Sequence, residues 1–381
     1  MAAFQHFTLK LLNPCFDSDL IDVLTELEKL RNLQLQTDVN PSIFLQLKNI
    51  FHMLESLGSA RIEGNHTTLA DYVESHLTDE DQNSEHIDEI KNIEQAMHFI
   101  DDSLQDGDDI SEAFIRKLHQ LTVDGLVREG DRTPGQYRTG HVRIAQSDHL
   151  PPNPIDVPMY MQELVDFINN KDKPKYDLMK IALVHHRFGW IHPFSNGNGR
   201  TVRLLTYALL VKYGFNVQTG GRVLNPTTVF CTDRNKYYEM LSCADKGDDG
   251  SLETWCTYVL SGISSELKKV DKLTAKEFLN KNILLPAIEY SVRRAHITAD
   301  EAKILRLATE SDGLKSGDIQ RLFPNLNANQ RTYKIRQLLN NKFLQPIEPN
   351  ARVYIPNFGQ SYLIRGIIES LRNHGFIGGL E

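Results

Sequence analysis

Apolar residues recur at three- and four-residue intervals along most of the chain, which is the spacing of amphipathic helices. In residues 17–36, Leu20, Leu24 and Leu27 follow this spacing, and Asp17 or Ser18 can serve as the N-cap. A second helix is expected to begin after Pro41. Further helices are predicted over residues 86–104, 111–126, 157–169, 176–190, 200–213, 234–244, 252–267 and 283–294. The pattern therefore predicts a mainly α protein.

One short segment between these helices alternates in the manner of a strand. His141-Val142-Arg143-Ile144 lies between a turn at residues 133–138 and the proline-rich break at residues 151–154. An exposed hairpin here would have an unpaired edge, and such an edge can capture an extended peptide by strand addition. Taken alone, the segment is better explained as a structural hairpin that covers the core.

The C-terminal part changes character and predicts a small α+β domain. Beyond Ile297 the order is a helix, a helix starting near residues 315–318, a helix over 327–341, strands at 344–347 and 352–355, and a closing helix over 362–371. Three helices and a hairpin resemble a winged helix-turn-helix. Basic residues outnumber acidic ones in this region, and the third helix carries Arg331, Lys334 and Arg336. DNA binding and protein contacts, including a homodimer, both remain open.

Composition limits the class of protein. A chain of 381 residues with 40% hydrophobic and 24% charged content is an ordinary globular protein of two or three domains. We expect an N-terminal region at 1–110, a core at 111–265, a linker helix at 266–296 and a last domain at 297–381. No signal peptide or spanning segment is evident, which predicts a cytoplasmic location. The net charge of −8 argues against general coating of nucleic acid. The four cysteines lack disulfide or zinc spacing, so buried free thiols are expected.

Candidate chemistry is concentrated in residues 191–203, between two apolar helical segments. Residues 196–199 are two Asn and two Gly, and such a turn can direct successive backbone N–H groups at an anion. The helix that follows adds its N-terminus. Arg200 and Arg203 lie one turn apart and could bind different phosphates of a nucleotide. His192 is the group in the motif that can accept a proton near neutral pH.

These residues match the pattern His-x-Phe-x-(Asp/Glu)-Gly-Asn-Gly-Arg-x-x-Arg, and the sequence therefore resembles the Fic (Fic/Doc) family from about residue 59 to residue 263. The resemblance implies transfer of AMP from ATP, with Mg²⁺, to a hydroxyl of a target protein. His192 would deprotonate that hydroxyl, and Arg200 and Arg203 would bind the phosphates. The loop and helix start would bind ATP through Asn196, Gly197, Asn198, Gly199, Thr201 and Val202.

Two positions in this motif bear on the chemistry. Asn196 stands where the family has a metal-binding Asp or Glu; its amide oxygen can ligate Mg²⁺ but carries no charge. Gly199 stands where kinase-like relatives such as Doc have Lys, which favours nucleotidyl over phosphoryl transfer.

The segment Ser59-Ala60-Arg61-Ile62-Glu63-Gly64-Asn65 is expected to form one or two helical turns ending at Gly64. A carboxylate at a helix C-terminus is unfavourable unless a cation pairs with it, so Glu63 should have a cationic partner. The segment is similar to the inhibitory motif of some Fic proteins, in which Ser59, Glu63 and Asn65 occupy motif positions. The resemblance implies that Glu63 pairs with Arg203 and takes the place of the γ-phosphate of ATP.

The resemblance also assigns the surroundings of the nucleotide. The adenine and ribose pocket would include Ile144, Ala145, Tyr237, Tyr238 and Asp245, although Asp245 stands where a relative has Asn. The segment His141–Ser147 would be the family's β-hairpin flap, along which a target protein binds. His185 and His186 do not form a recognisable metal set with His192, and core histidines are the better interpretation.

Two functions are therefore carried forward. The first is an autoinhibited protein adenylyltransferase, in which Glu63 could also position a water that removes AMP from modified targets. The second is a DNA-binding regulator whose Fic part, weakened at Asn196, only senses nucleotide.

Overall fold

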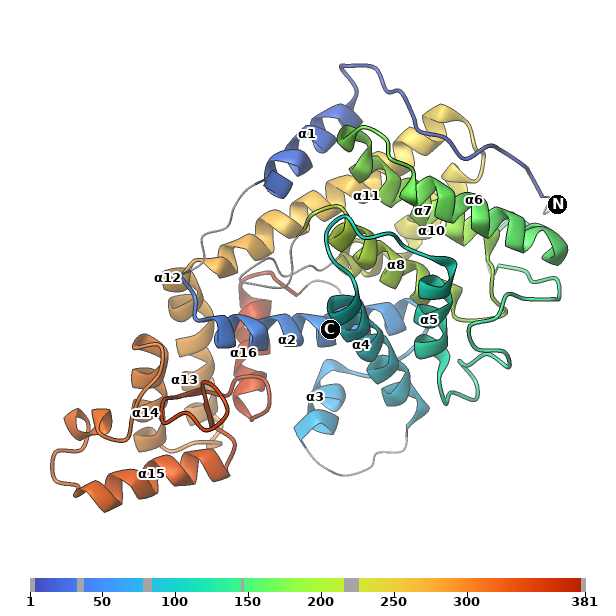
Figure 1. Cartoon of the computed structure of the whole chain (residues 1–381). Coiled ribbons are helices and arrows are strands. Elements are labelled where there is room, and N and C mark those ends of the chain that lie inside the picture. Colours follow the sequence, from blue (N-terminus) through green and yellow to red (C-terminus); the bar gives the residue numbers. More distant parts are fainter. Residues whose placement is uncertain (1–3, 33–37, 78–83, 145–146, 216–225, 378–381) are drawn as a thin grey trace. The chain divides into compact units, whose positions relative to one another are not determined.

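The computed structural model describes residues 4–32, 38–77, 84–144, 147–215 and 226–377. These parts of the chain are mainly helical, as predicted (Figure 1). Contacts between Cα atoms divide the chain into two compact units. The first comprises residues 1–34, 52–67 and 83–268, and the second comprises residues 35–51, 68–82 and 269–381.

The first unit is a bundle of helices around two buried ones. Helix α7 (Asp177–Ile191) packs against α8 (Asn198–Lys212), and α8 also packs against α4 (Glu85–Ser103) and α5 (Glu112–Val123). Nearly every residue of α7 and α8 is buried, which shows that other elements enclose both helices. The loop between them is therefore held at both ends by buried structure. The unit's other helices are α1 (Asp19–Asn32), residues 52–62 of α2 (Pro41–Ile62), α6 (Val157–Asn169), α9 (Thr227–Cys231), α10 (Arg234–Ala244) and most of α11 (Asp249–Val270).

Two predicted elements of this part differ in the structure. Helix α2 runs without a break from Pro41 to Ile62, so residues 59–62 continue a long helix instead of forming separate turns. Gly64, with a φ of 102°, takes the left-handed conformation just beyond the helix end. Residues 141–144 form no strand, and residues 145–146, including Ala145, lie outside the described part of the chain. A strand needs a ladder partner, and no described strand pairs with this segment.

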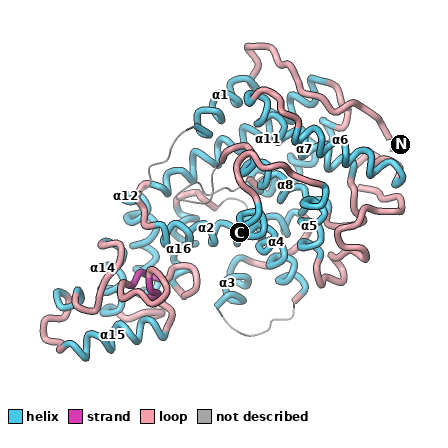
Figure 2. Tube along the Cα trace, in the orientation of Figure 1, coloured by secondary structure: helices cyan, strands magenta, loops and turns pink. Residues whose placement is uncertain are grey.

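The second unit combines short helices with one hairpin. It holds α3 (Leu69–Leu77), α12 (Lys276–Leu279), a π-helical turn (Asn280–Leu284), α13 (Leu285–Arg293), α14 (Ala299–Glu310), α15 (Ala328–Asn340) and α16 (Leu363–Asn373). Strands β1 (Leu344–Pro346) and β2 (Tyr354–Pro356) pair antiparallel, and Figure 2 shows them as its magenta segments. The helix expected near residues 315–318 is a single 3₁₀ turn, Asp318–Arg321. The predicted order of the remaining elements is confirmed.

The closing helix α16 approaches α13 closely through Gly366. A Cβ at this position would lie 2.4 Å from the Ala287 carbonyl oxygen and 2.7 Å from the Ala287 Cα, so no side chain fits. The adjoining face of α16 is strongly apolar and buries Leu363, Ile367 and Leu371. Close backbone packing therefore explains this glycine within a helix, where it otherwise lowers stability.

All four cysteines are free thiols, as expected, but only Cys256 is fully buried. Cys15 is exposed, and Cys231 and Cys243 are partly buried, so the prediction of burial was wrong for these three. Among the described helices, none combines the length and the apolar character needed to cross a membrane.

Candidate active site

His192 lies at the point where α7 stops. It is the C-cap of the helix, with a φ of 50°, and its backbone N–H donates to the Phe188 carbonyl. The left-handed conformation costs a residue other than glycine about 1 kcal/mol or more, so the surrounding structure must hold it. Pro193 follows and prevents the helix from continuing. The chain therefore turns sharply and leaves the imidazole at the end of a buried helix.

Arg138 holds this strained turn. Its Nε donates to the His192 carbonyl oxygen at 2.8 Å, its Nη2 donates to the Pro152 carbonyl oxygen at 2.6 Å, and its backbone N–H donates to the Pro193 carbonyl oxygen at 2.9 Å. The side chain is buried, and burial lowers its pKa without removing its charge at neutral pH. The sequence indicated only a turn at residues 133–138. Arg138 is a positioning residue that sequence reasoning missed.

The loop that follows is closed by Asn198 and Gly197. The Asn198 Oδ1 accepts from the Phe194 N–H, and its Nδ2 donates to the Phe194 carbonyl, both at 2.9 Å. Gly197, with a φ of 72°, is the N-cap of α8. The predicted turn is thus present, and it leads into a helix N-terminus as the sequence indicated.

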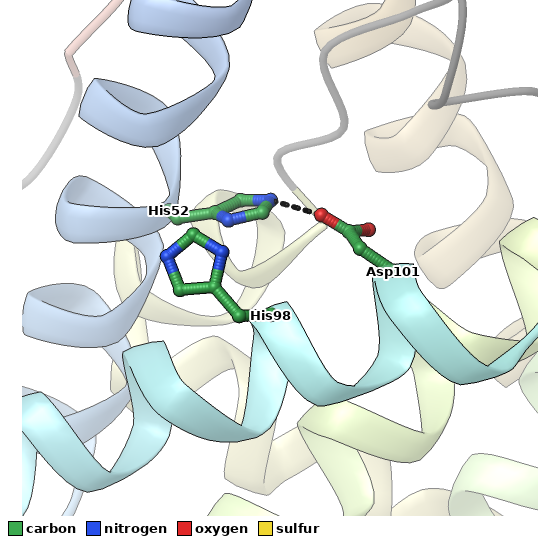
Figure 3. Close-up of side chains that lie close together, drawn as sticks. All are labelled: His52, His98 and Asp101. Carbon is green, nitrogen blue, oxygen red and sulfur yellow. Dashed lines mark ion pairs between the residues drawn. The ribbon is translucent and has the colours of Figure 1, made fainter.

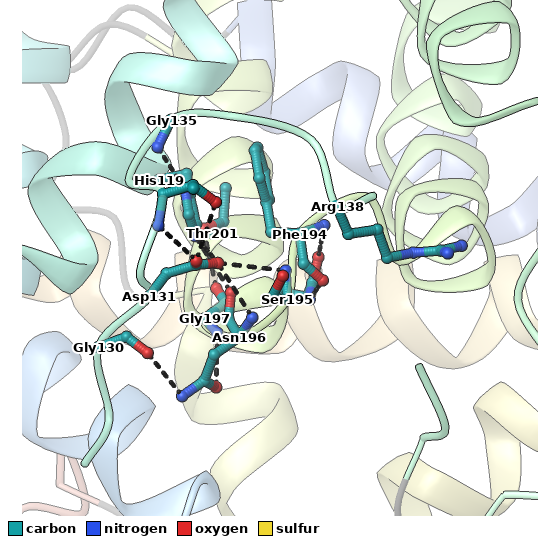
Figure 4. Close-up of polar contacts among 12 residues, drawn as sticks. His119, Gly130, Asp131, Gly135, Arg138, Phe194, Ser195, Asn196, Gly197 and Thr201 are labelled. Carbon is teal, nitrogen blue, oxygen red and sulfur yellow. Dashed lines mark hydrogen bonds and ion pairs between the residues drawn. The ribbon is translucent and has the colours of Figure 1, made fainter. Parts of the chain in front are cut away.

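Asp131 supports the loop from outside. Its Oδ2 accepts hydrogen bonds from the backbone N–H groups of Ser195, at 3.1 Å, and Asn196, at 3.3 Å (Figure 4). The carboxylate is almost completely buried. It therefore fixes the direction of two loop amides, a role that the sequence did not suggest because Asp131 is more than sixty residues away.

His119 completes this support as a neutral ring. The Gly135 N–H donates to Nδ1 at 2.9 Å, so the ring proton lies on Nε2, which donates to the Asn196 carbonyl oxygen at 3.1 Å. The imidazole stacks on the Phe194 ring, with centroids 3.7 Å apart. Burial lowers the pKa of His119 to about 4, which keeps this tautomer neutral near pH 7.

Glu63 lies at the N-terminus of α8 beside Arg203. Its Oε1 accepts from the Arg203 Nη2 at 2.7 Å, and the same guanidinium donates to the Ser59 hydroxyl at 2.8 Å and to the Ser59 carbonyl at 3.0 Å. A Cβ on Gly199 would lie 2.1 Å from that Glu63 oxygen. The carboxylate thus occupies the anion position that a helix N-terminus and an arginine create, and it fits because residue 199 has no side chain.

Electrostatics keep Glu63 ionised. Burial alone would raise the pKa of this carboxyl, but Arg203, Arg200 and Arg234 outweigh it and lower the pKa below its ordinary value. In the same way, the pKa of Arg203 is raised: burial opposes the charge, and Glu63 with Tyr237 and Tyr238 more than offsets it. The pair is therefore charged at neutral pH.

His192 faces the same cavity as this ion pair. Burial lowers the pKa of His192 to about 4, a hydrogen bond with the Gly189 backbone acts in the opposite direction, and Arg138 lowers it further. A neutral imidazole at pH 7 can accept a proton. The cavity has a volume of about 140 Å³, and its lining includes Glu63, Ile144, His192, Asn198, Gly199, Val202, Arg203, Tyr237, Tyr238 and Asp245.

Helix α10 supplies the aromatic wall of the cavity. The rings of Tyr237 and Tyr238 are 5.4 Å apart and inclined at 32°. The Tyr237 hydroxyl contacts the His185 Nε2 at 2.8 Å, and the His185 Nδ1 contacts the Thr206 hydroxyl at 2.7 Å. His186 Nε2 lies 2.9 Å from Asp245 Oδ1. His185 is thus a core histidine with both nitrogens hydrogen-bonded, as expected.

Several predicted site residues lie outside the lining of the cavity. Arg200 points away from it: its Nη1 pairs with the buried Glu89 Oε1 at 2.8 Å, and its Nη2 donates to the Glu129 carbonyl at 2.7 Å. Asn65 Nδ2 donates to the other oxygen of Glu89 at 2.8 Å, so it supports Arg200. The remaining ones, which hold the loop or Arg203 in place, are Ser59, Asn196, Gly197 and Thr201.

The donors at residue 196 do not fit a protein-held Mg²⁺. Asn196 Oδ1 accepts from the Gly197 N–H at 2.7 Å, and its Nδ2 donates to the Gly130 carbonyl at 3.2 Å. The adjacent carboxylate of Asp131 is directed at the loop amides. Since Mg²⁺ in proteins is usually held by a carboxylate together with substrate phosphates, any Mg²⁺ here would arrive with the nucleotide as MgATP.

Contrary to the sequence prediction for Asn196 and Gly197, the N–H groups of residues 194–197 donate to side chains of the protein instead of facing an anion. What the structure brings together is the N-terminus of a buried helix, a neutral histidine beside it and an arginine in the same cavity, all within a helical domain. Residues 109–210 match the Fic/DOC family. This segment of the chain is therefore similar to the Fic domain.

Curated relatives agree with this assignment. The chain is 30% identical over 202 residues to the protein adenylyltransferase Fic of Nematostella vectensis, which covers 50% of this chain and 42% of the relative. It is 32% identical over 204 residues to the protein of the same name in Drosophila melanogaster, covering 52% of this chain and 37% of the relative. The chain thus spans only about two fifths of the length of these relatives.

Solved structures support the fold. A Fic family protein from Desulfovibrio desulfuricans G20 aligns over 92% of this chain and 98% of its own, with a TM-score of 0.55 and 19% identity. A Fic-domain signaling protein from Bacteroides thetaiotaomicron VPI-5482 aligns over 68% and 98%, with a TM-score of 0.51 and 21% identity.

Proposed function

We propose that this protein is an adenylyltransferase that transfers AMP from ATP to a hydroxyl side chain of a target protein and is restrained by its own Glu63. The observation that carries the proposal is the Glu63 carboxylate on the α8 N-terminus, bound to Arg203 at 2.7 Å in the cavity that His192 lines. A phosphate group of ATP would need the same donors. Its binding and that of Glu63 are therefore mutually exclusive.

The proposed reaction uses groups of the chain at each step. The target oxygen attacks the α-phosphorus, and its proton passes to the neutral imidazole of His192. The bond from the α-phosphorus to the bridging oxygen breaks, and pyrophosphate leaves. Backbone N–H groups in the first turn of α8 stabilise charge on the phosphate oxygens. Asp131 and His119 hold the loop that precedes this turn and so fix its position. Arg203, once released from Glu63, binds the phosphate tail.

Replacing Glu63 tests the restraint. Glu63→Gly should raise incorporation of labelled AMP, into the protein itself or added targets, by about tenfold or more, because Arg203 and the helix N-terminus become available to ATP. The gain should disappear in Glu63→Gly with His192→Ala. Glu239→Gly, which removes an exposed carboxylate outside the cavity, is the matched control. Equal incorporation by wild type and Glu63→Gly would refute the autoinhibition.

Removal of AMP is a second reaction that the same site supports. The Glu63 side chain is 30% exposed and lines the cavity with His192, so it could orient a water toward the phosphorus of an AMP-modified residue. The water would add to the phosphorus, and AMP and the free hydroxyl would result. Release of AMP from a modified target by wild type, and its loss in Glu63→Gly, would support this reaction.

The target segment is proposed to bind along residues 141–147. Described residues here are exposed or partly exposed and belong to no helix or strand, which suits pairing with an extended peptide. The backbone bond from the Ser147 N–H to the Ile144 carbonyl, 3.4 Å long, would open if such a peptide paired at those two residues. Ile144 and Ser147 line the cavity. A peptide held there would present its hydroxyl to His192.

A nucleotide-sensing DNA regulator remains the alternative, favoured by Asn196 and by the basic residues of α15. Of these, Lys334 Nζ lies 3.4 Å from Asp300 Oδ2, and Arg331 donates to the Leu326 carbonyl, so two of the three cations already have partners in the chain. The labelled-ATP assay separates the two functions. Nucleotide binding without any transfer, even by Glu63→Gly, would support the sensor.

A further inference from the structure

A cluster of possible metal ligands lies outside the proposed active site, between α2 and α4. One ligand atom each from His52, His98 and Asp101 falls within 4.8 Å of the others. His52 Nε2 is 3.4 Å from Asp101 Oδ2, and the two imidazole rings are 5.1 Å apart in an edge-on arrangement. Figure 3 shows both imidazoles and the carboxylate converging from the two helices. None of these residues takes part in the proposed reaction.

The donor set and its spacing suit a divalent transition metal. Two imidazoles and one carboxylate are ligands for Zn²⁺, with bonds of about 2.0–2.2 Å, which places neighbouring ligand atoms roughly 3–3.5 Å apart in a tetrahedral site. The separation between His52 and Asp101 already has this value. His98 and Asp101 lie one turn apart on α4 and therefore share a face. A small rotation of the solvent-accessible His98 ring would complete three ligands and leave a fourth position for water.

The carboxylate of this cluster has an outer partner. The Tyr207 hydroxyl donates to Asp101 Oδ1 at 2.7 Å, which leaves Oδ2 directed toward His52. Tyr207 is buried on α8, one turn beyond Arg203. In natural metal sites, a hydrogen bond to the second oxygen of a ligating carboxylate orients that carboxylate toward the metal. The cluster is therefore supported by a side chain from a third helix.

We propose that His52, His98 and Asp101 form a binding site for a divalent transition-metal ion of the Zn²⁺ class, and that the ion clips α2 to α4. His52 precedes Ser59 by two turns on α2, and Ser59 and the adjoining Glu63 are the groups that bind Arg203. An ion at His52 would fix α2 where Glu63 reaches Arg203, and its removal would loosen that contact. This regulatory consequence, but not metal binding itself, rests on the proposed function.

Titration of the whole chain tests the site. Untagged protein, stripped with chelator and dialysed, is titrated with ZnCl₂ by calorimetry and with Co²⁺ by visible absorption. Wild type should bind one ion and unfold at a higher temperature when it is loaded. His98→Ala should weaken binding by about tenfold or more, as loss of one ligand should. His86→Ala, an exposed histidine on the same helix, should bind as wild type does. Unchanged affinity in His98→Ala, or no binding by wild type, would overturn the proposal.

Activity tests the regulatory consequence separately. At constant Mg²⁺, saturating Zn²⁺ should lower AMP incorporation by wild type several-fold and should leave His98→Ala and Glu63→Gly almost unaffected. Equal inhibition of all three would place the Zn²⁺ effect at the nucleotide and refute the regulatory role. If the protein transfers no AMP at all, the proposed function fails, whereas the titration still decides whether the metal site exists.

Discussion

Two anions compete for Arg203 in the proposed reaction: the Glu63 carboxylate and a phosphate group of ATP. The position of Glu63 at a helix end predicted that it has a cationic partner, and the resemblance to the Fic family implied that this partner is Arg203. The structure places the two side chains 2.7 Å apart. Sequence reasoning could not predict the direction of Arg200. Residues three apart on a helix differ by about 60° in direction, and Glu89, far away in the sequence, provides the closer partner.

The pKa of His192 leads to a prediction about pH. Burial lowers this pKa to about 4, so the imidazole is deprotonated and able to accept a proton throughout the neutral range, and loses that ability only as pH falls through the lowered value. In Glu63→Gly the pKa should fall further, because Glu63 contributes to raising it. AMP incorporation by this variant, at saturating ATP, should therefore show no histidine titration between about pH 6 and pH 8. An acidic limb centred near 6.5, the ordinary histidine value, would contradict the assignment.

Asp131 leads to a second prediction at this scale. The Asp131 carboxylate accepts hydrogen bonds from two loop N–H groups, and Asp131→Asn replaces it with an uncharged amide. The two N–H groups should then be held less firmly, and the loop should become less well ordered. In the Glu63→Gly background, kcat for AMP incorporation should fall about tenfold, the equivalent of about 1.4 kcal/mol. Asp124→Asn, at an exposed carboxylate, is the control. An unchanged kcat would show that the loop keeps its geometry without Asp131.

At the scale of elements, the helical periodicity predicted α6, α7, α8 and α10 to within a few residues, because each has a wide apolar face. It failed where local pattern and tertiary context disagree. Alternation at residues 141–144 indicated a strand, yet without a described ladder partner the segment stays irregular. Gly64 suggested that only one or two helical turns end near residue 62, but burial of α2 on most sides sustains one long helix through residues 59–62.

The α13–α16 contact supplies a prediction of stability. Gly366→Ala would place a methyl group about 2.4 Å from the Ala287 carbonyl oxygen, so the two helices must separate. Overpacking of this kind typically costs about 1–3 kcal/mol, which exceeds the gain in helix propensity. The thermal unfolding midpoint should fall by several degrees. Gly375→Ala, which meets nothing within 4 Å but has a φ of 73°, distinguishes a clash from backbone strain.

At the scale of the whole molecule, the sequence suggested domains that follow one another along the chain. The structure instead groups the chain into two compact units, each built from several separate segments. Residues 35–51 and 68–82 group with the C-terminal part, and no local pattern could show this because it depends on long-range contacts. The winged-helix interpretation, DNA binding and dimerisation stay predictions. The Fic-like motif, by contrast, could be recognised from the sequence, because its residue types stand at fixed spacing within one loop and one helix.

Because residue 199 has no side chain, the proposed restraint depends on two positions that are far apart in the sequence, Glu63 and Gly199. A side chain at residue 199 would displace the Glu63 carboxylate, because a methyl group does not fit between the two residues. The effect on Arg203 would be the same as that of removing the carboxylate. If unrestrained modification of cellular proteins is toxic, a change at either position should harm the cell. Selection against unrestrained activity would then keep Glu63 and Gly199 together. A genetic screen for toxic variants should recover changes at residue 63 more readily than at residue 199, because a side chain at residue 199 would also crowd a nucleotide bound as proposed.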